Sequence, residues 1–265
     1  MAITCIFSFL SLYFILLQPS NERNWQQDVA KLSYATIEDN FVSIHNIRNF
    51  EYRSEFDYTP AYYDKTYDLD KLEGVDIVAV YWMGELIAHT FLSFHFGQEN
   101  YLAISIERRK EVDEEYSTLK GFFRQYELYY VVADEQDVIK LRTNYRKNPL
   151  EDVYIYPLSS SKENARKLFL EYIDNINTLK DSPEFYNTLT TNCTTAIWKN
   201  NHVNDNNLSF SWKILASGYV PEYLYENGYL QTKGLSFEEL RQSVYVNTKA
   251  NAVELGENFS VEIRR

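Results

Sequence analysis

Two alternating segments joined by a polar turn constrain the fold of this chain more than any other feature. Apolar and polar side chains alternate in Ile87–Phe96 and again in Tyr101–Glu107, and the tetrad Gly97–Asn100 between them begins with glycine. Alternation with a period of two on both sides of a glycine-containing turn predicts a β-hairpin. One face of this hairpin is expected to be apolar core. The other face carries the polar side chains, which are His89, Ser93, His95, Ser105 and Glu107.

Strand-like segments precede helix-like segments along the rest of the chain. Ser160–Glu163 has the spacing of a capping box, and apolar residues then recur at helical intervals until shortly before Pro183. A second, short helix is expected to begin near Cys193, with Thr191 or Asn192 as its cap. This order predicts an α+β fold. The further candidate strands, rich in aromatic and β-branched residues, are Phe41–Ile47, Val75–Val80, Tyr126–Val132 and Val153–Tyr156.

Length and charge limit the classes of function. The chain has 265 residues, and we expect one folded unit over residues 19–265. Acidic residues outnumber basic ones 38 to 26, and no cluster of lysine or arginine stands out. Because phosphate neutralisation needs a clustered basic face, we expect no nucleic-acid partner. Two cysteines, Cys5 and Cys193, are too few for a disulfide framework or a cysteine-rich zinc site.

Residues 1–18 form a candidate membrane anchor or signal. Ala2–Leu17 carries no charge and is almost wholly apolar, although it is slightly shorter than the roughly 20 residues that span a bilayer. No A-x-A-type cleavage signal follows at Gln18–Ser20, which favours an uncleaved anchor over a cleaved signal peptide. A buried core helix is the third alternative. The expected location is the bacterial inner membrane, with the folded unit facing the periplasm.

Cys193 is the candidate nucleophile. It lies in Thr190–Thr195, where polar residues suited to a helix cap surround the thiol. A helix N-terminus directs N–H groups and positive dipole at the sulfur, which lowers the pKa of the thiol and provides donors for an oxyanion. The structural alternative is a small, buried, unreactive cysteine.

His89 is the candidate base for this thiol, and Glu107 is the candidate third residue. A thiolate nucleophile needs an imidazole to take its proton, and His89 lies in mid-strand on the polar face of the hairpin. Counting back from the turn puts Glu107 or Arg108 opposite His89, and of the two only Glu107 shares its face. Ser105 is the neighbouring alternative. A structural histidine and a charged strand end explain the same residues without catalysis.

A polar and aromatic cluster over His45–Arg53 is a candidate for substrate binding. Arg48 or Arg53 could bind an anionic headgroup or carboxylate, whereas hydrogen bonds that brace a loop are the alternative explanation. No acidic spacing matches a calcium loop, so no metal site and no cofactor are expected. The candidate substrate-binding residues are His45, Arg48, Asn49, Ser105 and Asn192.

Several blocks of residues, in one order, resemble the Lnb N-terminal periplasmic domain family. The blocks are Pro19–Trp25, Ile44–Phe50, Asp57–Pro60, Thr66–Leu69, Ala88–Thr90, Leu102–Glu107, Phe122–Glu127 and Thr191–Thr194. This family looks like a branch of the permuted papain-like (NlpC-type) thiol superfamily, which implies an antiparallel sheet with helices. The resemblance further implies that Cys193 is the nucleophile, His89 the base and Glu107 a less certain third member.

Members named Lnb are lipoprotein N-acyltransferases of the bacterial cell envelope. The resemblance therefore implies phospholipid as acyl donor, an amine of a lipoprotein or peptide as acceptor, and a membrane tether. An NlpC-type peptidase or amidase that acts on cell-wall peptides fits the same residues, as does a membrane-tethered binding module without catalysis. Aromatic side chains are favoured at membrane interfaces. The candidates for such contact are Trp25, Tyr58, Tyr62, Tyr63 and Trp82.

Overall fold

A seven-strand path of one sheet runs through the middle of the molecule, with an eighth strand paired beside it. The computed structural model describes residues 17–265 except 98, 115–125, 188–191, 205–207 and 255. The sheet order is β1-β2-β9-β8-β7-β6-β10, and β5 pairs with β2. These strands are β1 (Tyr34–Glu38), β2 (Phe41–Arg48), β5 (Tyr62–Asp68), β6 (Leu72–Tyr81), β7 (Ala88–Phe96), β8 (Tyr101–Arg109), β9 (Glu127–Ala133) and β10 (Asp152–Pro157). A separate two-stranded ribbon joins β3 (Glu51–Tyr52) and β4 (Tyr58–Thr59).

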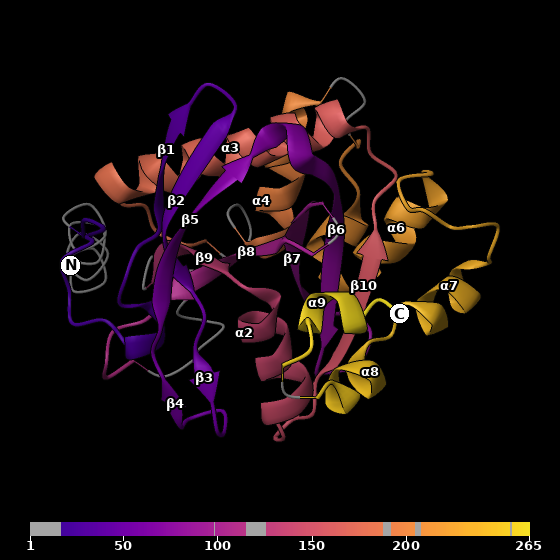
Figure 1. The fold of residues 1–265 in the computed structure, drawn as a ribbon, viewed down its shortest axis with the longest axis horizontal. Coiled ribbons are helices and arrows are strands. Elements are labelled where there is room, and N and C mark those ends of the chain that lie inside the picture. The colour runs from indigo at the N-terminus through magenta and orange to yellow at the C-terminus, as the bar shows by residue number, and fades with distance from the viewer. Residues whose placement is uncertain (1–16, 98, 115–125, 188–191, 205–207, 255) are drawn as a thin grey trace, which may run out of the picture.

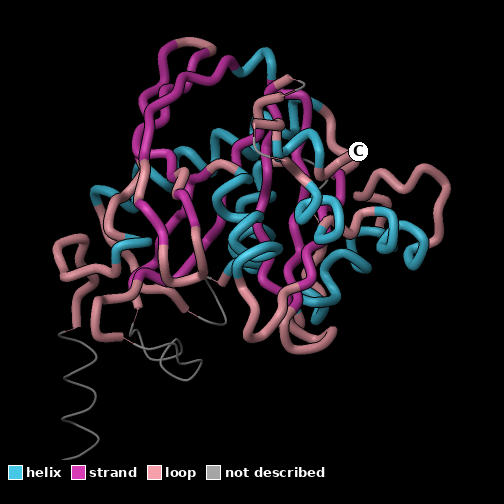
Figure 2. Tube along the Cα trace, turned by 60° about the horizontal axis from the view of Figure 1, so that its bottom comes forward, coloured by secondary structure: helices cyan, strands magenta, loops and turns pink. Residues whose placement is uncertain are grey.

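The expected strands are present, but the sheet is mixed rather than antiparallel. Each candidate strand corresponds to an observed strand within a few residues at its ends. Neighbours are antiparallel except β2 and β9, which are parallel where Arg48 pairs with Ala133. That pairing joins two segments far apart in the sequence, so no local pattern could indicate its direction. Figures 1 and 2 show β1, β2 and β5 rising together at one end of the sheet.

Helices cover both faces of the sheet (Figure 1). One core lies between the sheet and helices that include α3 (Lys162–Asp181), α4 (Cys193–Asn200) and α6 (Val220–Glu226). A second core lies between the opposite face and the elements α2 (Glu135–Lys140), α8 (Asn247–Ala252) and α9 (Phe259–Glu262). The remaining helices are α5 (Trp212–Leu215), α7 (Phe237–Ser243) and the short turns η1 (Gln27–Val29), η2 (Leu69–Lys71), η4 (Leu141–Tyr145), η5 (Asn201–Val203) and η6 (Ser217–Tyr219).

The face of the hairpin that was predicted to be polar is covered by the second layer of helices. Phe91 and Ser93 on that face are both almost fully buried. The hydroxyl of Ser93 donates a 2.6 Å hydrogen bond to Glu135 of α2, so burial of this polar residue is compensated by a partner. The hairpin itself is confirmed, and Gly97 adopts the positive φ of +74° that the turn requires.

Helix α3 begins one residue later than the capping pattern indicated. Ser161 rather than Ser160 is the N-cap, and its hydroxyl accepts the N–H of Asn164. The apolar residues predicted to recur along this helix are buried in the first core. Residues 1–16, which carry most of the expected anchor, lie outside the described residues. Among the helices that the structure does describe, none combines the length and apolarity needed to cross a bilayer.

Candidate active site

The register of β7 and β8 places His89 and Glu107 across from each other. The strands pair from His95 with Tyr101 to Leu92 with Ile104. Continuing that register by three residues brings His89 opposite Glu107, as counting back from the turn predicted. The hydrogen-bonded pairing described for the two strands ends at Leu92, although both strands continue to the level of His89. The site therefore lies where two neighbouring strands separate.

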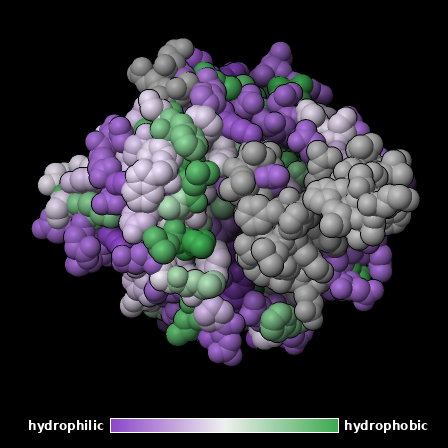
Figure 3. Space-filling view, turned by 180° about the vertical axis from the view of Figure 1, so that it is seen from behind, coloured by the Kyte–Doolittle hydropathy of each residue, from purple (hydrophilic) through white to green (hydrophobic). Residues whose placement is uncertain are grey.

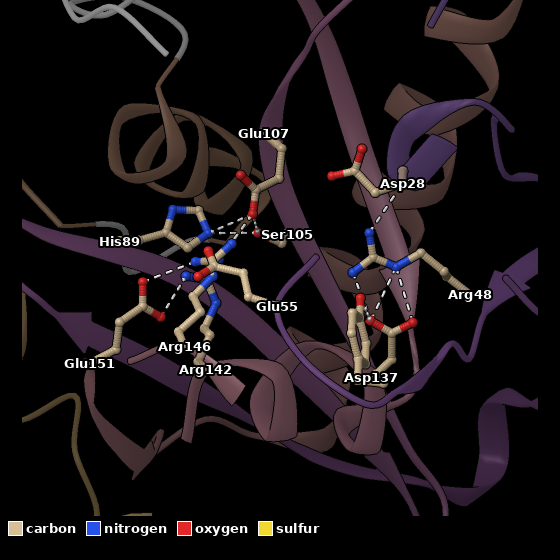
Figure 4. Close-up of polar contacts among 11 residues, drawn as sticks. Asp28, Arg48, Glu55, His89, Ser105, Glu107, Asp137, Arg142, Arg146 and Glu151 are labelled. Carbon is tan, nitrogen blue, oxygen red and sulfur yellow. Dashed lines mark hydrogen bonds and ion pairs between the residues drawn. The ribbon is translucent and has the colours of Figure 1, made fainter. Parts of the chain in front are cut away.

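One ring nitrogen of His89 is held by Ser105 and Glu107 (Figure 4). Its Nε2 lies 2.9 Å from Oε1 of Glu107 and 2.8 Å from Oγ of Ser105. The Ser105 hydroxyl donates a 2.8 Å hydrogen bond to the same carboxylate oxygen. Because the serine proton points at Glu107, Oγ can accept only from a protonated Nε2. These contacts fix the orientation of the ring and leave Nδ1 free to face the thiol.

Cys193 is the first residue of helix α4, and Asn192 caps that helix. The side-chain oxygen of Asn192 accepts the N–H groups of Thr194 at 2.9 Å and Thr195 at 2.8 Å. Thr195 returns a contact to the backbone of Asn192, which completes a capping box. The expected helix and cap are both present. This cap aligns the first turn of the helix and holds the thiol at its positive end.

The thiol of Cys193 and the imidazole of His89 change each other's pKa. Burial opposes ionisation of Cys193, but the hydrogen bond and positive charge of His89 outweigh it and lower the pKa of the thiol to about 7. Hydrogen bonds from the Thr90 backbone and from the Thr194 side chain act in the same direction.

Glu107 makes His89 a stronger base. Burial lowers the pKa of His89, but the charge of Glu107 and the hydrogen bonds to Cys193 and Glu107 raise it to about 9. The pKa of Glu107 lies well below its usual value because His89, Arg142 and Ser105 outweigh the effect of burial. Between about pH 7 and pH 9 the favoured state is thus a thiolate beside an imidazolium, the reactive form of a cysteine nucleophile.

A row of charged residues behind Glu107 was not predicted from the sequence. Arg142 lies 3.3 Å from Glu107 and 3.2 Å from Glu151, and Arg146 lies 2.9 Å from the other oxygen of Glu151 (Figure 4). Arg146 also contacts Glu55 at 3.3 Å. The two arginines are four residues apart, a spacing that indicates one face of a helix. That spacing was a signal in the sequence, but nothing local linked it to Glu107.

Arg48 lies in a separate buried ion pair. It belongs to β2 and makes a 2.7 Å contact with Asp137 of α2, and the N–H of Phe50 donates to the same carboxylate. Both side chains are almost completely buried. These contacts correspond to the bracing role weighed above, and they engage the guanidinium that was the candidate for headgroup binding.

The other candidate binding residues also have structural contacts. His45 stacks on Tyr34 at 4.5 Å between ring centroids, and its Nδ1 lies 2.7 Å from Asp64. Asn49 donates its backbone N–H to Ala61, and Asn192 caps α4. Of this group, only Ser105 and Asn192 directly support the cysteine and histidine. No group of three metal-ligating side chains occurs among the described residues.

Comparison with known proteins adds a family to this geometry. The family model described as the Lnb N-terminal periplasmic domain matches residues 58–218, which include Cys193, His89 and Glu107. The match begins later than the first resembling block, Pro19–Trp25, and extends beyond the last, Thr191–Thr194. No curated protein and no solved structure matches the chain. Because the matched segment covers more than half of the sequence, the chain belongs to the Lnb N-terminal periplasmic domain family.

Proposed function

We propose that this protein is a thiol acyltransferase of the cell envelope that moves a fatty acyl group from phospholipid to an amine. The acceptor class is the N-terminal amine of a lipoprotein. One observation carries the proposal: Cys193 begins helix α4, and its pKa is lowered by His89, whose Nε2 is held by Glu107. A helix-borne cysteine paired with a strand histidine is also the arrangement of a permuted papain-like enzyme, which is the architecture we assign.

The reaction has two steps that conserve atoms and charge. The Cys193 thiolate attacks the ester carbonyl of the phospholipid, a C–S bond forms, and His89 donates its proton to the departing alcohol oxygen. The acceptor amine then attacks the thioester, His89 takes a proton from the amine, and the thiolate leaves. The products are a lysophospholipid and an amide, and no cofactor is needed.

The first turn of α4 is suited to the oxyanion of each step. Asn192 holds the N–H groups of Thr194 and Thr195, so the N–H of Cys193 is the donor nearest the sulfur in this turn. A donor fixed beside the developing negative charge stabilises the transition state, and the loss of one such donor typically costs about 100-fold or more in rate. The helix dipole acts in the same direction.

An exposed apolar surface beside the site favours a lipid substrate. Met83, Leu86 and Ile87 precede His89 in the loop between β6 and β7, and all three are exposed. Phe210, Trp212 and Leu215 are exposed in and before α5. Figure 3 shows hydrophobic side chains gathered in a band on the face seen from behind.

Helix η6, which directly follows the second exposed segment, contacts the first and brings the two onto one side of the molecule. Gly218 donates its N–H to the carbonyl of Leu86 at 3.1 Å, and Ser217 accepts the N–H of Ala88 at 3.0 Å. Trp212 packs edge to face on Tyr219 in the same region. A contiguous exposed apolar surface marks an interaction site, and we assign it to the membrane that holds the donor lipid. Trp82 belongs to this loop, whereas Trp25 packs against Arg109 within the fold.

A periplasmic location follows from the family description, and the apolar segment at residues 2–17 provides a tether to the inner membrane. A tethered domain needs only weak affinity for the bilayer. The net charge of −12 opposes tight binding to anionic lipid, which agrees with transient contact at the membrane surface.

Intact-mass analysis after incubation with phospholipid vesicles tests the proposal. The expected result is one added acyl chain on the full-length wild-type protein and none on Cys193→Ala. Addition of a lipoprotein-derived peptide with a free N-terminal amine should remove the adduct and give the acylated peptide. Absence of an adduct on the wild type, or an equal adduct on Cys193→Ala, would overturn acyl transfer in favour of a peptidase or a binding module.

A further inference from the structure

A cavity of about 610 Å³ lies between the sheet and the helices of the first core. Its floor comes from β6 and β7, and its walls come from α3, α4, α5 and α6. None of the residues that line it carries a charged side chain. Its apolar lining residues include Ile77, Leu92, Leu168, Ile197, Trp198 and Ile214.

The cavity is lined by the residue that follows the candidate nucleophile. This residue is Thr194, and its Oγ1 is 3.7 Å from Sγ of Cys193. Ile197, Trp198 and Asn201 continue the same side of α4 and its extension at helical intervals. Cys193 is not itself a lining residue, but its sulfur contacts a side chain that is.

The opposite end of the cavity is more polar and faces solvent. Leu158 lines this end and donates its N–H to the carbonyl of Val75. Ser159 and Asn164 also line this end, and Ser159 is exposed. The cavity therefore reaches the surface at this end.

We propose that this cavity binds the aliphatic chain of the acyl group that Cys193 carries. The proposal rests on the acyltransferase function above and names the part of the substrate that the chain itself selects. A neutral lining disfavours a phosphate headgroup or a charged peptide side chain, because buried charge needs a charged partner. Since a water molecule occupies about 30 Å³ and a methylene group is of similar size, the cavity has room for roughly 20 chain carbons.

A series of p-nitrophenyl esters from acetyl to palmitoyl tests the assignment. With the full-length protein, the rate of p-nitrophenol release should rise by up to about fourfold per methylene until the chain fills the cavity. Ile214→Trp, which fills the cavity from α5, should reduce release from the palmitoyl ester at least tenfold and release from the acetyl ester much less. The control Ile37→Trp makes the same change in β1, at an exposed residue that does not line the cavity.

Binding without chemistry separates this proposal from the proposed function. Cys193→Ser should bind the fluorescent fatty acid cis-parinaric acid, and Ile214→Trp in the same background should abolish the signal. If Ile214→Trp fails to fold, Ile197→Trp provides the same obstruction from α4. Fatty-acid binding without any ester turnover would refute the transferase and leave the cavity assigned. Turnover with no dependence on chain length would overturn the cavity assignment and leave the transferase intact.

Discussion

The carboxylate of Glu107 links the candidate base to the charged row behind it. Its Oε1 contacts His89, Ser105 and Arg142, so a single oxygen atom orients the ring of His89 and is itself held by Arg142. Arg142 is in turn fixed by Glu151 at 3.2 Å. In the proposed reaction, these contacts would hold the base in position while the proton moves between sulfur and substrate.

The reactivity of the thiol toward iodoacetamide should follow the pKa values of the pair. We expect the alkylation rate of Cys193 to be half-maximal near pH 7 in a Cys5→Ser background, because His89 lowers the pKa of the thiol to about 7. A free cysteine has a pKa of about 8.5, so at pH 7 the thiolate fraction is roughly 15-fold higher here. The lower intrinsic nucleophilicity of such a thiolate reduces the gain in rate to about threefold.

His89→Gln should move that midpoint above the value for a free cysteine. Without the imidazolium, the pKa of Cys193 responds to burial, which opposes the charged form. Alkylation across pH 5–10, followed by mass spectrometry, measures both midpoints. A midpoint that stays near pH 7 in His89→Gln would show that His89 does not set the pKa of the thiol.

Glu107→Gln should impair acyl transfer more than Ser105→Ala. Loss of the carboxylate removes the charge that raises the pKa of His89 and leaves the ring orientation undefined, so we expect a decrease in rate of about 100- to 10,000-fold. Ser105→Ala leaves the direct 2.9 Å contact between Glu107 and His89 in place. Single-turnover transfer from an activated acyl ester measures both variants, and equal losses would argue against the proposed role of Glu107.

At the level of elements, the site depends on a close backbone approach beside β7. A Cβ added at Gly218 would lie 1.9 Å from the carbonyl oxygen of Glu85, in the loop that leads into the strand of His89. Only glycine fits there without a shift of backbone. The contact joins η6 to the loop between β6 and β7, and the same loop carries three of the exposed apolar residues.

Gly218→Ala should therefore disturb both stability and reactivity. We expect a loss of about 1–3 kcal/mol in the free energy of unfolding from overpacking, together with slower alkylation of Cys193 as residues 85–88 shift. Gly234→Ala is the control, since it meets no atom within 4 Å and carries only the strain of its positive φ. Urea unfolding and iodoacetamide kinetics measure the two effects. Unchanged alkylation in Gly218→Ala would show that the approach does not position β7.

For the whole molecule, the C-terminal segment is held to the sheet by a buried ion network. Arg264 contacts Glu135 of α2 at 2.6 Å and Asp76 of β6 at 2.7 Å, and both carboxylates are almost inaccessible to solvent. Burial raises the pKa of Glu135, but Arg264 outweighs it and the net shift is downward. The network joins three segments that are far apart in the sequence.

Arg264→Ala should destabilise the fold by about 3–5 kcal/mol, because it leaves two buried carboxylates without their cation. Arg265→Ala is the matched control. Its side chain is 71% exposed and pairs only with a neighbouring glutamate of the same segment, so a change within about 0.5 kcal/mol is expected. Chemical denaturation at pH 7 measures the free energy of unfolding of both variants. Equal losses in Arg264→Ala and Arg265→Ala would show that the buried ion network does not stabilise the fold.

The pH dependence of stability has a definite sign. A carboxyl whose pKa is lowered by folding contributes stability above its unfolded pKa, about 4.3 for glutamate, and loses it as the pH falls through the folded value. Protonation of Glu135 should therefore lower the free energy of unfolding of the wild type as the pH falls below about 4.3. The acid-induced loss should be smaller in Arg264→Ala, and denaturation at pH 3–7 measures the difference.

The sequence by itself determined the local parts of this protein. Alternation and a glycine turn predicted the β7–β8 hairpin, and the count from the turn together with the shared face predicted that Glu107 lies opposite His89. Asn192 before Cys193 predicted a capped helix that carries the thiol. These features depend on neighbours in the chain, whose conformations are restricted by local sterics and hydrogen bonding.

Only the tertiary structure decided which distant segments meet. The parallel pairing of β2 with β9, the helices that bury the second face of the hairpin, and the approach of Arg142 to Glu107 each join residues far apart in the chain. The polar and aromatic composition of His45–Arg53 placed Arg48 among the binding candidates, whereas the fold pairs it with Asp137. Such contacts are set by the packing of whole layers, because a buried charge is tolerated only where the assembled fold supplies its partner.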